Sequence, residues 1–301
     1  MHRISREHLV YALDKRHPPV LEIPPGEGIV FETCDARTGT IQTEQDLLDH
    51  PHPLGMNPAT GPVWVQGAEP GDSLVVEIRG IALAKQGFLA VKAGVGLLGH
   101  RADRFATRIL RIEEGMAQLG DRLRFPVRPM VGVIGTAPRG EGVSTGLPGP
   151  HGGNMDNNEV RVGARVHLPV FVPGALLGIG DVHASMGDGE ISMVGFEVSG
   201  EVTVWIDLLK GQSLSRLWIE TADGRWVTTG EDLDPTRAMR MASEEMVNRL
   251  MEHWGLSFED AYMLVTARAD LAICQACQPG EFPVTTRMSF PAGEIQQGVG
   301  C

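Results

Sequence analysis

Alternating apolar and polar positions run through most of the chain. Residues 62–78 read PVWVQGAEPGDSLVVEI, two alternating runs on either side of a Pro-Gly-Asp turn, and residues 201–209 alternate in the same way. Because neighbouring side chains of a strand point to opposite faces, an apolar–polar period of two indicates strands with one buried face. Two further strands should meet in a hairpin at Asp223 and Gly224. The pattern therefore predicts a mainly β protein.

A helical period near 3.6 residues is clearest in the last third of the chain. Asp234 and Pro235 suit the N-cap and first position of a helix, and Gly255 suits its end. Ser257 suits the cap of a second, shorter helix, and residues 43–50, which open with a capping-box-like pattern, predict another. The apolar stripe of the long helix consists of Met239, Ala242, Met246, Val247, Leu250, Met251 and Trp254.

These patterns predict a β-sandwich or jelly-roll-like body with a C-terminal α+β region. We expect residues 1–200 to form the body and carry the functional site, and residues 201–301 to complete the fold. The composition agrees, because 38 glycines and 20 prolines with only 5% aromatic residues favour many short strands and turns over long helices.

The charge balance narrows the choice of partners. With 26 basic and 38 acidic residues, the formal net charge is −12, which disfavours nucleic acid or an anionic membrane as a partner. The first twenty residues lack the apolar core of a signal peptide, and no apolar run is long enough to span a bilayer. We therefore expect a cytoplasmic protein, and the acidity is no argument for any particular substrate.

Candidate chemistry concentrates in residues 151–197. Asp181 and His183 stand two positions apart, so on a strand both side chains point to one face, and Asp188 and Glu190 repeat that spacing. A carboxylate and an imidazole on one face suit a divalent cation such as zinc or manganese. A neighbouring carboxylate would then act as general base for a metal-activated water. The alternative is that these glycines and acids only mark surface turns, but the repeated spacing favours a functional site.

Two of the four cysteines, Cys274 and Cys277, form a C-x-x-C pattern that is typical of redox or zinc sites. They stand in the apolar run DLAICQAC, which predicts a strand with the two side chains on opposite faces. We interpret them as structural thiols of a reducing compartment.

Several long segments resemble the acetamidase/formamidase family. That family hydrolyses small amides to ammonia and a carboxylic acid with the help of a metal. The resemblance therefore implies an amidohydrolase that acts on linear C–N bonds, and it also implies a homodimer. Two positions depart from the usual pattern, Met186 in place of glutamine and Thr266 in place of serine. The matching segments are HGGNMD (151–156), LPVFVPGALLGIGDVHASMGDGE (168–190), PVWVQGAEPGDSLVVEI (62–78), PMVGVIGTAP (129–138) and EDAYMLVT (259–266).

These observations give each candidate residue an expected role. The metal, zinc first and calcium or manganese as alternatives, should be held by Asp181 and His183. The resemblance adds Asp35 as the third ligand, and Glu197 is expected as a further ligand or a supporting acid. Glu190 is the expected general base, with Asp188 as a second catalytic carboxylate. The residues expected to bind or orient the substrate are His151, Gly153, Asn154 and Asp156, with backbone N–H groups of the glycine pair facing the oxyanion.

Two other functions fit the same residues. A β-sandwich that binds a metal or ligand without a working base would use the same Asp-x-His pair. A hydrolase of a lactam or cyclic imide could use the same scaffold.

Overall fold

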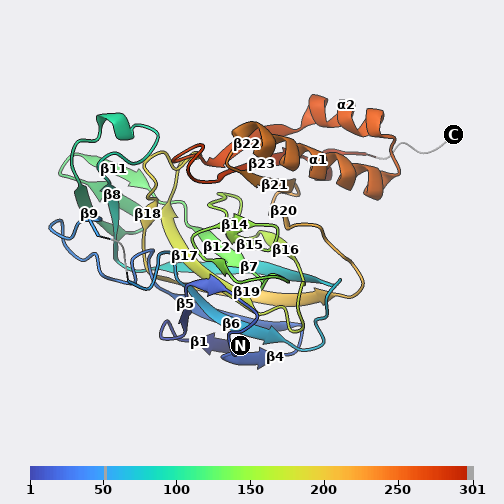
Figure 1. The fold of residues 1–301 in the computed structure, drawn as a ribbon, viewed down its shortest axis with the longest axis horizontal. Helices are drawn as coiled ribbons and strands as arrows, with labels where there is room; N and C mark the ends of the chain where they lie inside the picture. Colours follow the sequence, from blue (N-terminus) through green and yellow to red (C-terminus); the bar gives the residue numbers. More distant parts are fainter. Residues whose placement is uncertain (51–52, 297–301) are drawn as a thin grey trace.

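The computed structural model describes residues 1–50 and 53–296, so Cys301 lies outside the described residues. Strands dominate, and two α-helices follow near the C-terminal end (Figure 1). The mainly β class with C-terminal helices is therefore confirmed. Among the described residues, no helix is both long and apolar enough to cross a membrane.

The first sheet joins strands from both ends of the chain. Its nine strands are, in spatial order, β1 (His2–Ile4), β5 (Glu27–Thr33), β19 (Gly200–Leu209), β7 (Ser73–Leu83), β16 (Arg165–Pro169), β20 (Trp218–Glu220), β21 (Trp226–Asp232), β23 (Val284–Phe290) and β22 (Asp270–Gln275). β19, which begins at residue 200, lies between β5 and β7. The C-terminal region extends the same sheet, and the division into two parts stays a prediction.

The second sheet is built around β17. Nine of its strands follow the order β11 (Leu123–Pro126), β10 (Met116–Leu119), β9 (Ala106–Glu113), β8 (Gln86–Val91), β18 (Phe196–Glu197), β17 (Leu177–Ser185), β12 (Met130–Gly135), β15 (Gly152–Asn154) and β14 (Pro148–Gly149). On β17 also lies β6 (Ala59–Val65), which pairs with β2 (Leu9–Val10) and β4 (Leu21–Ile23). A separate two-stranded sheet joins β3 (Ala12–Leu13) to β13 (Val143–Ser144), and short 3-10 helices cover Gly99–Arg101 and Ala292–Glu294.

The two large sheets share one apolar core. Phe31 and Ile78 of the first sheet and Ile134 and Val182 of the second belong to the same buried cluster. Burial of such side chains is the main favourable term in folding. The predicted strands on either side of the turn at Asp72 are confirmed as β6 and β7, but they run in different sheets, so the turn carries the chain across the sandwich.

Both predicted C-terminal helices are confirmed. α1 (Pro235–Trp254) begins where the Asp234 side chain accepts a hydrogen bond from the Thr236 N–H, and it ends at Gly255 with a φ of 65°. α2 (Phe258–Arg268) is capped by Ser257. The helices lie against β21 and β23 through an apolar cluster of their own, at the end of the molecule away from β5 and β6 (Figure 1).

The helix predicted over residues 43–50 is wrong, because that segment forms turns and bends. The Asp46 carboxylate accepts the N–H groups of Gln42 and Thr43, as in a capping box, but no helical run follows. Leu48 instead packs into a small cluster with Phe88, which draws the chain away from a helical path.

Candidate active site

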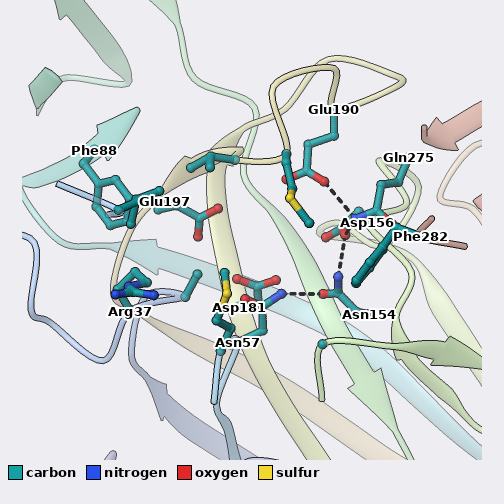
Figure 2. Close-up of a pocket in the computed structure, with 16 residues that line it drawn as sticks. Arg37, Asn57, Phe88, Asn154, Asp156, Asp181, Glu190, Glu197, Gln275 and Phe282 are labelled. Carbon is teal, nitrogen blue, oxygen red and sulfur yellow. Dashed lines mark hydrogen bonds between the residues drawn. The ribbon is translucent and has the colours of Figure 1, made fainter. Parts of the chain in front are cut away.

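A cavity of about 100 Å³ opens beside β17, where the second sheet meets the C-terminal region. Its walls come from segments that lie far apart in the sequence, and Figure 2 shows their side chains converging on one space. Such a volume is small beside the 300–1,000 Å³ typical of pockets for drug-sized ligands, so it suits a ligand of a few heavy atoms. The polar and aromatic residues that line it include Arg37, Asn57, Phe88, Asn154, Asp156, Asp181, Glu190, Glu197, Gln275 and Phe282.

The Asp-x-His pair lies on β17 as the spacing predicts. His183 Nε2 is 3.6 Å from Asp181 Oδ1 and 3.2 Å from Glu197 Oε1. Glu197 lies opposite His183 in the pairing of β18 with β17, across a register shift that leaves Ala184 as the extra residue. The bulge therefore lies on β17. The three side chains are at most 3% exposed. Their ligand atoms all lie within 4.8 Å of one another, so they could hold one metal ion.

A second group of potential ligands shares the same histidine. Asp156, His183 and Glu190 also offer three atoms within 4.8 Å of one another. Asp156 lies two positions beyond the end of β15, and Glu190 lies in the loop between β17 and β18. Because Glu190 lies in a loop, strand alternation does not determine where its side chain points. The structure thus brings four carboxylates and one imidazole together.

A chain of side-chain hydrogen bonds fixes one wall of the cavity (Figure 2). Asn57 Nδ2 donates to Asn154 Oδ1 at 3.0 Å, and Asn154 Nδ2 donates to Asp156 Oδ2 at 2.9 Å. Gln275 Nε2 donates to the same Asp156 oxygen at 2.7 Å and to Glu190 Oε2 at 3.0 Å. Each carboxylate therefore has one oxygen held by an amide, which fixes the direction of the other.

Three of the four carboxylate residues have an unusual backbone. Asp156, Asp181 and Glu190 have φ values of 44°, 53° and 41°, in the left-handed region that non-glycine residues rarely adopt. Such strain costs about 1–3 kcal/mol per residue and persists where the surroundings enforce it, often at functional sites. Its concentration in one cluster supports a functional interpretation.

Several polar atoms of the cluster have no hydrogen-bond partner among the described residues. Buried polar atoms in folded proteins are nearly always paired, so a group of unpaired ones indicates a missing ligand. Their chemistry, carboxylate oxygens and imidazole nitrogens, is that of zinc or manganese ligands. The atoms are Asp156 Oδ1, Asp181 Oδ1, His183 Nδ1 and Nε2, and Glu197 Oε2.

Two glycines have no side chain where the side chains of His183, Asp156 and Asp181 need room. A Cβ atom at Gly195 would lie 2.6 Å from His183 Nδ1. A Cβ atom at Gly132 would lie 2.7 Å from Asp156 Oδ1 and 2.8 Å from Asp181 Oδ2. Each distance is well below van der Waals contact, so any larger residue would displace the ligand group.

The electrostatics of the cluster favour a cation. Burial raises the pKa of Glu197 to about 8. Burial and the charge of Glu190 raise the pKa of Asp156 well above its usual range. Burial alone lowers the pKa of His183, but the charges of Glu197 and Asp181 outweigh it and raise that pKa. The raised pKa values of these acids reflect the cost of ionising them together in a buried site, and a divalent cation would offset that cost.

Asp35 and Asp188 lie differently from the expectation. Burial raises the pKa of Asp35, and the nearby negative charge of Asp181 raises it further. Asp35 belongs to neither ligand group, however, and its Oδ1 accepts the N–H groups of Arg37 and Gly39. Asp188 does not share a face with Glu190, because its carboxylate turns outward and forms two hydrogen bonds with Arg287 at 2.9 and 2.6 Å.

Among the residues expected to bind substrate, Asn154 and Asp156 line the cavity, whereas His151 and Gly153 are not among its lining residues. Gly153 lies within β15, paired with β12 on one side and β14 on the other. His151 packs against Gly149 and Gly153, and burial lowers its pKa to about 4. These two residues therefore support the wall from behind.

Sequence patterns missed Gln275, Asn57 and Arg37. Gln275 is a buried polar residue in the apolar run that holds Cys274 and Cys277, and such a residue is a signal because glutamine is rarely buried without a role. Asn57 and Arg37 lie in loops and carry no comparable signal. Tertiary contacts alone bring them to the cavity.

Comparison with known proteins agrees with the geometry. A model of the acetamidase/formamidase family matches residues 11–141 and 139–279. The crystal structure of an acetamidase from Bacillus halodurans is 38% identical and superposes with a TM-score of 0.92 over 96% of each chain. The acetamidase of Mycolicibacterium smegmatis is 24% identical over 86% of each protein.

A protein of Schizosaccharomyces pombe that is provisionally named a formamidase is 30% identical over 62% of this chain. That match spans 61% of the yeast protein. The resemblance drawn from the sequence is confirmed, including its implication of an amidohydrolase of the linear-amide type. The chain belongs to the acetamidase/formamidase family.

Proposed function

We propose that this protein hydrolyses a small linear amide, of the formamide or acetamide type, to ammonia and a carboxylate with the help of a divalent metal. The observation that carries the proposal is the buried cluster of four carboxylates and one imidazole around a cavity of about 100 Å³. The small volume favours a short acyl group.

Asp181, His183 and Glu197 are the proposed metal ligands, because they combine three buried ligand atoms with unpaired lone pairs. Two carboxylates and an imidazole suit zinc, with manganese or calcium as alternatives. A bound divalent ion supplies Lewis acidity, which polarises the amide carbonyl and makes water a better nucleophile. Asp35 is proposed to support Asp181 from behind.

Glu190 is proposed to move the proton. Water attacks the amide carbon while a carboxylate oxygen of Glu190 takes one of its protons, and the C–N bond breaks as that proton passes to the leaving nitrogen. The products are a carboxylic acid, which ionises, and ammonia. Gln275 holds Glu190 Oε2, so the other oxygen is directed to this task. Asn154 and Asp156 are proposed to orient the amide from the opposite wall.

Replacing Glu190 with glutamine tests this function. Glu190→Gln keeps the size and hydrogen-bonding reach but cannot take a proton, so kcat for ammonia release should fall by about 10²–10⁴-fold with metal content unchanged. Asp181→Asn and His183→Ala should lose metal and activity together. Ammonia release from formamide, acetamide and longer amides, measured beside metal content, separates the two patterns.

The outcomes decide the roles. Loss of metal in Glu190→Gln would make Glu190 a ligand within the group it forms with Asp156 and His183. Full turnover in that variant would refute Glu190 as the base. Binding of amides without any ammonia release by the natural protein would favour the non-catalytic alternative. The homodimer and the cytoplasmic location stay predictions.

A further inference from the structure

Gln275 is tied by its backbone to the loop that carries Glu190. The Gly189 N–H donates to the Cys274 carbonyl at 2.9 Å, and the Ala276 N–H donates to the Gly189 carbonyl at 2.8 Å. These two bonds flank Gln275, which ends β22 just after a register shift against β23. The side chain of Gln275 therefore stands next to Glu190 whatever the exposed part of the loop does.

The orientation of the Gln275 amide is fixed by charge. Its Nε2 donates to Asp156 Oδ2 and Glu190 Oε2, so both N–H hydrogens are used. The reverse orientation would place the carbonyl oxygen against two carboxylate oxygens, which repel it. The Oε1 atom must consequently point away from both acids.

That oxygen is an acceptor without a donor. Gln275 is 3% exposed and lines the cavity, and its Oε1 has no partner among the described residues. A buried, unsatisfied carbonyl is unfavourable, and a ligand that brings an N–H group removes the penalty. An amide carbonyl oxygen accepts hydrogen bonds and cannot donate them, so this edge of the cavity selects for donors.

We propose that Gln275 determines substrate specificity by accepting a hydrogen bond from the N–H of the substrate amide. The inference rests on the proposed function and adds the substrate class: amides that carry at least one N–H, in preference to esters of the same size. An ester would place an oxygen lone pair against Oε1. Sites that hydrogen-bond a substrate N–H discriminate strongly against analogues that lack it.

Ligand-detected NMR titrations of acetamide and methyl acetate into the metal-loaded protein test the proposal, with released ammonia and acetate measured in each sample so that turnover is separated from binding. The natural protein should bind acetamide at least about tenfold more tightly than the ester. Gln275→Met, which keeps the length but removes the carbonyl together with the Nε2 donors to Asp156 and Glu190, should abolish this preference by weakening the binding of acetamide. Gln278→Met is the matched control, since Gln278 bonds to the exposed Glu281 and lies outside the cavity lining, and it should keep the preference.

Each contrary result overturns the inference. Equal or undetectable binding of the two ligands by the natural protein does so without any variant. A Gln275→Met protein that keeps the preference shows that the glutamine only holds the carboxylates. Loss of metal in that variant would show that Gln275 serves the metal site, through Oε1 or through the carboxylates that its Nε2 holds, and not the substrate N–H. Preferential acetamide binding without ammonia release would instead refute the proposed function and leave the recognition by Gln275 standing.

Discussion

At the scale of single residues, the site depends on where side chains are absent as much as on where they are present. Gly195 and Gly132 have no functional group. A Cβ atom at Gly195 would nevertheless collide with His183, and one at Gly132 would collide with the carboxylates of Asp156 and Asp181. Glycine at such positions permits close approach and is not simply a flexible joint.

Gly195→Ala should therefore damage the site without touching a ligand. The new Cβ would force the His183 ring to shift, so we expect loss of bound metal and a roughly 10²-fold lower kcat/KM, the effect of misplacing a reacting group by about 1 Å. Metal analysis and ammonia release measure both effects. Gly140→Ala, where a Cβ meets nothing within 4 Å, is the control. A fully active, metal-loaded Gly195→Ala protein would contradict the role of His183 as a fixed ligand.

The two cysteines beside Gln275 are expected to be structural. Both are 1% exposed, and burial raises the pKa of each thiol to about 12, so neither forms a reactive thiolate near neutral pH. Replacing both with alanine should leave kcat within several-fold and lower the free energy of unfolding by about 1–3 kcal/mol. Urea unfolding and turnover measure the two quantities. Loss of activity with fold and metal intact would show that the thiols take part in catalysis.

At the scale of elements, the loop between β17 and β18 has two sides with different tasks. Glu190 faces the cavity, whereas Asp188 pairs with Arg287 of β23 and accepts a further hydrogen bond from Asn158. Positive φ values at Gly189 and Glu190 turn the chain between them. The loop is thereby anchored on its outer side while its inner side presents the proposed base.

Asp188→Asn distinguishes an anchor from a catalytic acid. If Asp188 is an anchor, the substitution should lower the free energy of unfolding by about 1–2 kcal/mol, a modest value because Asp188 is partly exposed. It should slow turnover by less than about tenfold. Denaturant unfolding and steady-state kinetics provide the test, with Glu190→Gln as the comparison. If a stable Asp188→Asn protein turned over about a hundredfold more slowly, Asp188 would be restored as the second catalytic carboxylate.

At the scale of the whole molecule, the buried acids link metal binding to stability. The four carboxylates come from β17, β18 and two loops, and without a cation their ionised forms repel one another in a buried site. A cation that binds the folded state but not the unfolded state must stabilise the folded state by mass action.

The purified protein should contain about one or two divalent ions per chain, and a chelator should abolish amide hydrolysis. Removal should also lower Tm by several degrees, since saturation at a hundred times Kd contributes about 2.7 kcal/mol. Calorimetry before and after chelation, and again after zinc or manganese is restored, measures this. Unchanged Tm and full activity in metal-free protein would exclude the proposed metal dependence.

The sequence by itself determined the features that depend on local order. The period-two patterns predict the strands, the caps at Asp234 and Ser257 predict both C-terminal helices, and the spacing of Asp181 and His183 places both on one face of a strand. Each follows from geometry within a few residues. Residues 43–50 show where local patterns fail. A capping pattern is present there, but Leu48 is buried against the rest of the molecule and no helix forms.

Only the tertiary structure decided which side chains meet. Gln275 and Asp156 are separated by 119 positions yet share a hydrogen bond, and the bridge between Gln275 and Gly189 brings Gln275 beside Glu190. Asp188 and Glu190 have the same spacing in the sequence as Asp181 and His183. Positive φ values at Gly189 and Glu190, however, turn the backbone so that the two carboxylates point in different directions. Side-chain periodicity holds only along regular backbone, so wherever the chain turns or a distant strand joins, the composition of the site depends on packing that no local pattern contains.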